Sequence, residues 1–484
     1  MQLAQRPNVI EEVATEGKPA SRGTQAGLQN LLCIAAIVGV LFIRFYQTIF
    51  FGVPISKLYL IANWDPMFYQ YSGGPSFAFD PSLVELLLPY KFFVANLWHH
   101  GVPLWNEFNG FGMPLVADPQ SLVFCPIFAF FYLIPSVYTW NLTLIFTVVI
   151  GAVSSYLLFR EFELGFLASV AGALLFTFCP WVQWQLELLA NAHCLAAVVF
   201  LFFVKAGKRR SLWASAAAGL AAAVEILSVH PEVAFVTIAF ATIFMCLTAY
   251  YYDRGEFRPR SLLLRVGIAG AVAFGISAPA LVPFLEYVFN GETYKFAAGS
   301  GGSAIPLEAL FANLLFPFYK TGSIFLGPLA WLGLAVVAFF PKDNRFIRPL
   351  LICSVLCILP LTRTFPFSLL CSHHPFSMIY AAYYVPVCVL LLSALAASGI
   401  DTLFSGNIRS TRTRKIAAIA FSLILVLAPL VFLPWHRDSL TLHYDSSFEP
   451  PRFNWKLWLF DACAFVALIS VWAVTFKRTQ RWKT

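Results

Sequence analysis

The chain has 484 residues, of which 59% are hydrophobic and only 12% are charged, and its mean hydropathy is +0.74. A soluble protein would carry about 25% charged residues, so the composition excludes a soluble globular domain. The net charge of +8 does not indicate a nucleic-acid partner, because the basic residues gather in short connections between apolar runs, as the positive-inside rule describes. Most of the ten cysteines lie inside those apolar runs, which speaks against a disulfide framework.

The N-terminal region, residues 1–26, is polar, and we expect it to lie in the cytoplasm. The first apolar run, Gly27 to Phe51, is too long for the apolar region of a signal peptide and has no small-residue cleavage site, so it predicts a retained helix. Arg44 lies within this run. Two interpretations remain open for it: a side chain that snorkels to the membrane surface, or an inward-facing cation for an anionic ligand.

Further apolar runs follow along the chain and predict additional membrane-spanning helices. They cover approximately residues 121–137, 138–159, 165–181, 186–204, 211–229, 232–252, 263–288, 322–340, 347–362, 376–398, 415–434 and 456–476.

The basic connections alternate with these runs, which predicts that both termini are cytoplasmic and that the number of crossings is even. Thirteen runs are present in all, including the first. Either one of the shorter runs between Ser121 and Trp181 does not cross, or two of them form a re-entrant hairpin. Pro126 and Pro135 make 121–137 the weakest candidate. We therefore expect an all-α polytopic membrane protein with about 12 transmembrane helices.

The segment from Asn63 to Gln120 differs from the rest of the chain, because it combines five acidic residues and two adjacent histidines with many Gly and Pro residues. Irregular backbone is not tolerated facing lipid, so this segment must lie outside the bilayer or line a wet cavity. Within it, Ser82–His100 is too polar to cross and too apolar for water. We predict one or two helices there that lie along the membrane surface.

The order of residues in this segment resembles the bacterial YfhO-like membrane proteins, which belong to the GT-C superfamily of polytopic glycosyltransferases. The matching residues are Asp80, Pro89-Tyr90, Gly101 to Asn106, Gly112 to Leu115, Ala117 to Gln120, and Pro126. A second piece, Ser228 to Glu232, is similar to a short His-Pro-Gln/Glu element between two helices of such proteins. The residues after Lys295 show only generic membrane helices.

The resemblance implies a GT-C-like fold of 11–14 helices on the bacterial cytoplasmic membrane. It divides the chain into the N-terminus, a transmembrane module at 27–290 with a large outer loop at 52–120, and C-terminal helices at 291–484. It also implies a membrane glycosyltransferase that uses a polyprenyl-phosphate-linked sugar as donor, working at the outer face. The acceptor, a glycan, a lipid or a protein, is left open.

Transfer of a sugar needs a carboxylate that deprotonates or orients the acceptor hydroxyl. Asp80 matches the acidic position of the family at the depth of the donor headgroup, although Asp80-Pro81 is equally typical of a helix N-terminus. Asp65, in a similar Asp-Pro context, is the alternative. Asp118 matches a further acidic position and has a supporting role, with a helix cap as its competing interpretation.

The remaining candidates are substrate-binding residues. Trp105, Asn106 and Gln120 belong to the matching motifs. His230 and Glu232 lie at a helix junction, where they form either a wall of the site or a locally satisfied turn. Arg363 follows an apolar run directly, so it is either a phosphate contact or an interfacial anchor.

No nucleotide-binding loop, zinc spacing or nucleophile elbow occurs in the sequence, and nothing indicates a divalent metal or a cofactor other than the lipid-linked donor. The competing hypothesis is a transporter or flippase for a lipid-linked or small hydrophobic substrate. Such proteins usually show repeated halves with charges buried at mid-membrane. The absence of a repeat and the concentration of acidic residues in one outer loop favour the transferase.

Overall fold

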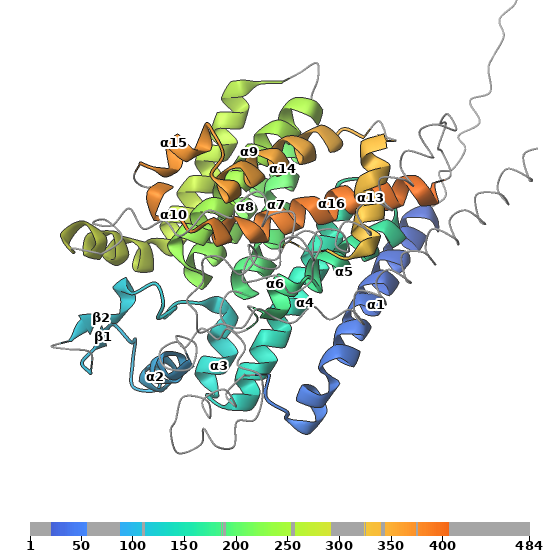
Figure 1. The fold of residues 1–484 in the computed structure, drawn as a ribbon. Helices are drawn as coiled ribbons and strands as arrows, with labels where there is room; N and C mark the ends of the chain where they lie inside the picture. The colour runs from blue at the N-terminus through green and yellow to red at the C-terminus, as the bar shows by residue number, and fades with distance from the viewer. Residues whose placement is uncertain are drawn as a thin grey trace, which may run out of the picture.

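The computed structural model in Figure 1 is almost entirely α-helical. It describes residues 21–55, 88–108, 112–184, 186, 190–252, 257–291, 324, 326–339, 344–373 and 376–405. The only strands within these ranges are β1 (Trp105–Asn106) and β2 (Met113–Pro114), which pair antiparallel. Asp65, Asp80 and the last two predicted spanning runs lie outside the described residues.

The described part of the chain contains six helical stretches long and apolar enough to cross a membrane, so the chain is a membrane protein. They are α1 (Ser21–Phe51), α4 (Val137–Glu161), α7 (Ala190–Arg209), α9 (Pro231–Tyr252), α10 (Pro259–Asn290) and the stretch formed by η7 (Ala381–Tyr384) with α16 (Val385–Phe404). Four shorter apolar helices are α5 (Phe166–Thr177), α8 (Leu212–Ser228), α13 (Pro328–Phe339) and α14 (Ile347–Thr362).

The run predicted at 121–137 is not a membrane-spanning helix. It contains only η5 (Pro126–Phe128) and α3 (Ala129–Leu133), and α3 ends before Pro135. Proline has no amide proton to donate and clashes with the preceding turn, which explains both interruptions. Ser136 then starts α4, since its hydroxyl accepts the backbone N–H of Thr139. Of the two explanations for the odd number of runs, the structure favours a non-crossing run.

The core of the bundle forms around α7 and α16. Helix α7 packs against α4, α8 and α9, and α16 packs against α5, α13 and α14. A Cβ atom on Gly399 of α16 would overlap the carbonyl oxygen of Gly333 in α13, so these two backbones touch directly. Helix α1 runs along the edge of the described bundle (Figure 1), and Arg44 is exposed on it beside the Phe45 ring. The exposure favours the snorkelling interpretation of Arg44.

The polar segment folds at one end of the bundle, where we call residues 88–133 the α2–α3 segment (Figure 1). Its helix α2 (Leu88–Trp98) confirms helical structure for part of the predicted 82–100 region. With 11 residues, α2 is about 16 Å long and therefore too short to cross a bilayer. The hairpin β1–β2 follows, and η4 (Leu115–Ala117) packs against α10.

The remaining short elements lie elsewhere in the bundle. They are α6 (Pro180–Trp184), α15 (Phe367–Cys371) and η6 (Phe376–Met378).

Candidate functional site

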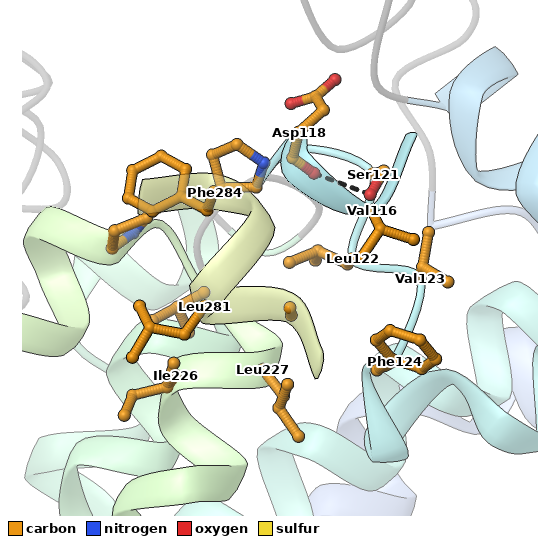
Figure 2. A pocket seen from close by; sticks show the side chains of 14 residues that line it. Val116, Asp118, Ser121, Leu122, Val123, Phe124, Ile226, Leu227, Leu281 and Phe284 are labelled. Atoms are coloured by element: carbon orange, nitrogen blue, oxygen red, sulfur yellow. Dashed lines mark hydrogen bonds between the residues drawn. The ribbon is translucent and has the colours of Figure 1, made fainter. Parts of the chain in front are cut away.

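The candidate site is built around a tight turn that begins at Asp118. The Asp118 Oδ1 atom accepts the backbone N–H of Gln120 at 2.8 Å. The Ser121 hydroxyl donates to the carbonyl oxygen of Asp118 at 2.7 Å, the bond drawn dashed in Figure 2. Leu122 then adopts a φ of 54°, a left-handed conformation that costs a non-glycine residue about 1–3 kcal/mol. The turn must therefore be held by the structure around it.

Three side chains from the neighbouring helices hold this turn by its backbone carbonyls. The donors are Lys91 Nζ to Gln120 and to Ser121 (3.2 Å), Tyr132 Oη to Leu122 (2.7 Å), and Trp98 Nε1 to Val123 (3.2 Å). Four consecutive carbonyl groups are thus satisfied by side chains of α2 and α3. A buried carbonyl without a partner costs about 1–3 kcal/mol, so these bonds outweigh the strained backbone.

Lys91 is the central member of this group. It is only 5% exposed, and its ammonium lies 5.7 Å from the centre of the Phe128 ring. Burial lowers the pKa of Lys91 from 10.5 to about 8, although the nearby Cys125 and Asp118 oppose the shift. Because its protons go to two carbonyls of the turn, Lys91 acts as a positioning residue for Asp118 and not as a contact for substrate.

Several predicted site residues gather around this turn. Trp105 is exposed, and its indole ring lies against Gly112, where a Cβ atom would overlap the ring. The φ of 97° at Gly112 is also a conformation that favours glycine. Asn106 is buried, and its Oδ1 accepts the backbone N–H of Phe108 at 3.0 Å. Tyr90 of α2 is buried beside Asp118 and Asn106. Burial first, and the charge of Asp118 second, raise the pKa of the Tyr90 phenol.

A small, open hollow of about 40 Å³ lies between this turn and three helices, α8, α9 and α10 (Figure 2). Its polar side chains are Asp118 and Ser121, and Figure 2 shows the Asp118 carboxylate at the rim, pointing away from the apolar walls. The walls are apolar and include Leu122 and Phe124 of the loop, Ile226 and Leu227 of α8, and Leu281 and Phe284 of α10. The hollow thus combines an apolar surface with a carboxylate at its rim.

The junction of α8 and α9 borders the hollow through Pro231, which lies between the predicted residues His230 and Glu232. The ring of His230 stacks on that of Tyr383, with the centroids 6.3 Å apart and the planes at 12°. Glu232 lies in the first turn of α9, where a carboxylate is favourable for the helix dipole. Both residues thus lie beside the hollow, and each also has a role in local structure.

Arg363 lies at the C-terminal end of α14. It ends α14 in a left-handed conformation, with a φ of 48°, and its backbone N–H donates to carbonyls of the last turn of that helix. Its charge acts on Cys371 of α15: burial raises the pKa of that thiol and Arg363 opposes the shift. Arg363 is not one of the residues that line the hollow, so the structure does not join it to Asp118.

Sequence reasoning missed the contribution of Lys91, although a signal was present. Lys91 is the single charged residue in α2, and an isolated charge among apolar neighbours needs a buried partner. Sequence reasoning also missed Ser121 and the walls from α8 and α10. Asp80 and Asp65 fall outside the residues that the structure describes. Within those residues, no group of three His, Cys, Asp or Glu side chains is close enough to hold a metal ion.

No model of a known protein family matches this sequence, and no curated protein matches it either. The geometry of the site is therefore the main basis for a functional conclusion.

Proposed function

We propose that the chain is a membrane glycosyltransferase that moves a sugar from a polyprenyl-phosphate-linked donor to an acceptor at the outer face of the bacterial cytoplasmic membrane. The observation that carries this proposal is the hollow between membrane helices, with apolar walls and a carboxylate and a hydroxyl at its polar end. This pattern suits a substrate with a hydrocarbon chain and a polar headgroup. The resemblance of residues 80–126 to YfhO-like proteins supports the same conclusion.

The orientation follows from the basic connections. If the positive-inside rule holds for all of them, both termini are cytoplasmic and the hollow opens at the outer end of the bundle. A lipid-linked donor on that face has its phosphate at the membrane surface and its chain among the helices. Cysteine-accessibility labelling tests this orientation: in intact cells, a cysteine at position 72 should react with an impermeant reagent and one at position 207 should not.

The chemistry requires one base and one stabilised leaving group. In the transfer, the acceptor oxygen forms a bond to the anomeric carbon and its proton passes to a carboxylate, while the bond from that carbon to the phosphate oxygen breaks and the lipid phosphate leaves. We assign the base to Asp80, with Asp65 as the alternative. Asp118 supports the headgroup end of the hollow, with Asn106 and Gln120 beside it, and the exposed ring of Trp105 offers a surface on which a sugar can stack.

The test is turnover of a lipid-linked sugar by the purified full-length protein. Asp80→Asn keeps the size of the side chain and should lower turnover about 10²–10⁴-fold, the usual effect of losing a general base. Asp118→Asn should retain much more activity. Full activity in Asp80→Asn together with loss in Asp65→Asn would transfer the role to Asp65, and full activity in both would refute the transferase.

The alternative, a transporter or flippase, is favoured by one observation. Acidic residues are not confined to the polar segment, because Glu225 of α8 is fully buried inside the helix bundle. Charged groups inside membrane bundles often mark transport pathways. Reconstitution in liposomes separates the two functions: a flippase moves the labelled lipid-linked sugar between leaflets with its sugar–phosphate bond intact, whereas a transferase breaks that bond.

A further inference from the structure

The side chain of Glu225 is the most unusual polar group in the bundle. It is 0% exposed, and neither of its carboxyl oxygens has a hydrogen-bond partner in the described residues. Helix α8 packs here against α7, α9 and α10. The hydroxyl of Thr237 in α9 faces the carboxyl group, and this hydroxyl is also buried without a hydrogen bond. Two polar side chains thus face each other in an apolar interior.

Within the described residues, no ion pair with a cation is present at the Glu225 carboxyl group. From α7, the titratable neighbour is the thiol of Cys194. The neighbouring His193 stacks its ring on Phe176 of α5 at 4.0 Å, and its Nε2 lies 3.0 Å from the Phe176 carbonyl oxygen. Helix α10 has no ionisable residue between Arg265 and Glu286.

Arg265 of α10 contacts the C-terminal end of α7, the opposite end from Cys194. Its Nη1 donates to the carbonyl oxygens of Ala206 at 2.7 Å and Gly207 at 3.1 Å. An unpaired carboxylate in such an environment is strongly unfavourable, whereas the neutral acid can donate its proton to the Thr237 hydroxyl.

We propose that Glu225 is a proton-binding site within the membrane core, and that its proton exchanges with water in the hollow near Asp118. The reaction is a simple transfer: the carboxylate takes a proton from hydronium, becomes the neutral acid and leaves water. The proposed sugar transfer assigns no role to Glu225 or Ser228, so this inference and the proposed function can fail separately, although both involve the hollow.

Polar groups lie between Glu225 and the end of α8 that borders the hollow. Ser228 lies one turn after Glu225 on the same face of α8, and its hydroxyl is 3.4 Å from the Cys125 thiol. The backbone oxygen of Ser228 accepts Asn191 Nδ2 at 3.3 Å, and Asn191 Oδ1 accepts the Thr147 hydroxyl at 3.3 Å.

Two of these polar groups lie at the wall of the hollow. Ser228 lies between Leu227 and Val229, and Cys125 follows Phe124; these three neighbours all line the hollow. Ser228 and Cys125 are buried directly behind these lining residues, on the side of the buried acid.

The first test is infrared spectroscopy of the purified full-length protein at neutral pH. Wild type should show the C=O stretch of a buried protonated carboxylic acid, and Glu225→Gln should lose it. Glu161→Gln is the matched control, because Glu161 forms an ion pair with Lys208 at 3.0 Å, whereas Glu225 has no such partner within the described residues. Thr237→Val should shift the band without removing it, which keeps the test valid if Glu225→Gln folds poorly. A wild-type spectrum without this band, or an unchanged band in Glu225→Gln, would overturn the proposal.

The second test follows exchange of the proton in deuterated water. The band should shift as the acid exchanges, and Ser228→Val should slow the shift at least tenfold by removing one of these polar groups. Ser393→Val is the control, because Ser393 is equally buried but lies on α16, away from these groups. Equal exchange rates in the wild type and Ser228→Val would overturn the proposed connection to the hollow. If the wild-type protein transfers no sugar but gives both expected infrared results, only the proposed function is refuted.

Discussion

The α2–α3 segment and the helix core satisfy their polar groups in opposite ways. In the α2–α3 segment the backbone is irregular, and the carbonyls of residues 120–123 are bonded by side chains of Lys91, Tyr132 and Trp98. In the core the helical backbone bonds to itself, and polar side chains such as Glu225 and Thr237 are left without partners. A buried polar side chain that bonds irregular backbone, as these three do, is thus explained by structure. A buried polar side chain that has no partner inside a regular helix needs another explanation, and a functional role is the first to test.

The contact between α13 and α16 gives the largest expected effect, because backbone meets backbone there without side chains between. Gly399→Ala places a methyl group against the Gly333 carbonyl, and no rotamer can relieve the overlap. We expect a loss of at least about 3 kcal/mol, at the upper end of the range for overpacked cores. Gly39→Ala in α1 is the control, since a Cβ there meets nothing within 4 Å. Thermal unfolding in detergent measures both, and equal midpoints would show that the two helices are not in close contact.

Removing Lys91 tests whether side chains hold the irregular segment. Lys91→Met fills similar space but leaves the carbonyls of Gln120 and Ser121 unpaired, which should cost about 2 kcal/mol. The buried thiol of Cys125 next to this turn should then react faster with a maleimide. An unchanged rate of labelling at Cys125 would mean that the turn keeps its shape without the lysine.

The same lysine predicts a dependence on pH with a definite sign. Its pKa is about 8 in the folded protein and 10.5 in the unfolded chain, so between these values the unfolded state binds more protons. Stability rises with pH under that condition: the cost of the buried charge is complete below pH 8 and disappears toward pH 10.5. The free energy of unfolding of wild type relative to Lys91→Met should therefore increase from pH 8 to pH 10. A constant difference would show that Lys91 titrates normally.

A single hydrogen bond should give the smallest effect. Tyr132→Phe removes the donor to the Leu122 carbonyl and should cost about 1 kcal/mol. Tyr138→Phe is the matched control, because its hydroxyl bonds the Ile49 carbonyl at 2.9 Å in an exposed position where water replaces it. If both variants unfold at the same temperature, the turn does not depend on its side-chain donors.

The fold was predictable from sequence where the information is local. Apolar length predicted most of the described spanning helices, and Pro126 and Pro135 explained why the run at 121–137 does not span. The grouping of Trp105, Asn106, Asp118 and Gln120 also followed from their nearness in sequence.

Contacts between segments that are far apart in the chain could not be predicted from the sequence. The hollow joins a loop near residue 120 with helices more than 100 residues later, and no pattern in either part indicates that contact. The apolar sequence of α8 likewise does not say which neighbours Glu225 meets. Arg363 lies after an apolar run as predicted, but the sequence does not say whether it lines the hollow, and in the structure it does not.

Helix α10 forms one wall of the hollow, and its two internal prolines make this helix easier to bend. Pro279 and Pro283 cannot donate to the carbonyls of Gly275 and Pro279, and after Ser277 no residue of α10 is fully buried. The opposite wall belongs to α8, whose backbone is regular and whose residues pack in the core. Bending of α10 should therefore widen or narrow the hollow while α8 stays fixed.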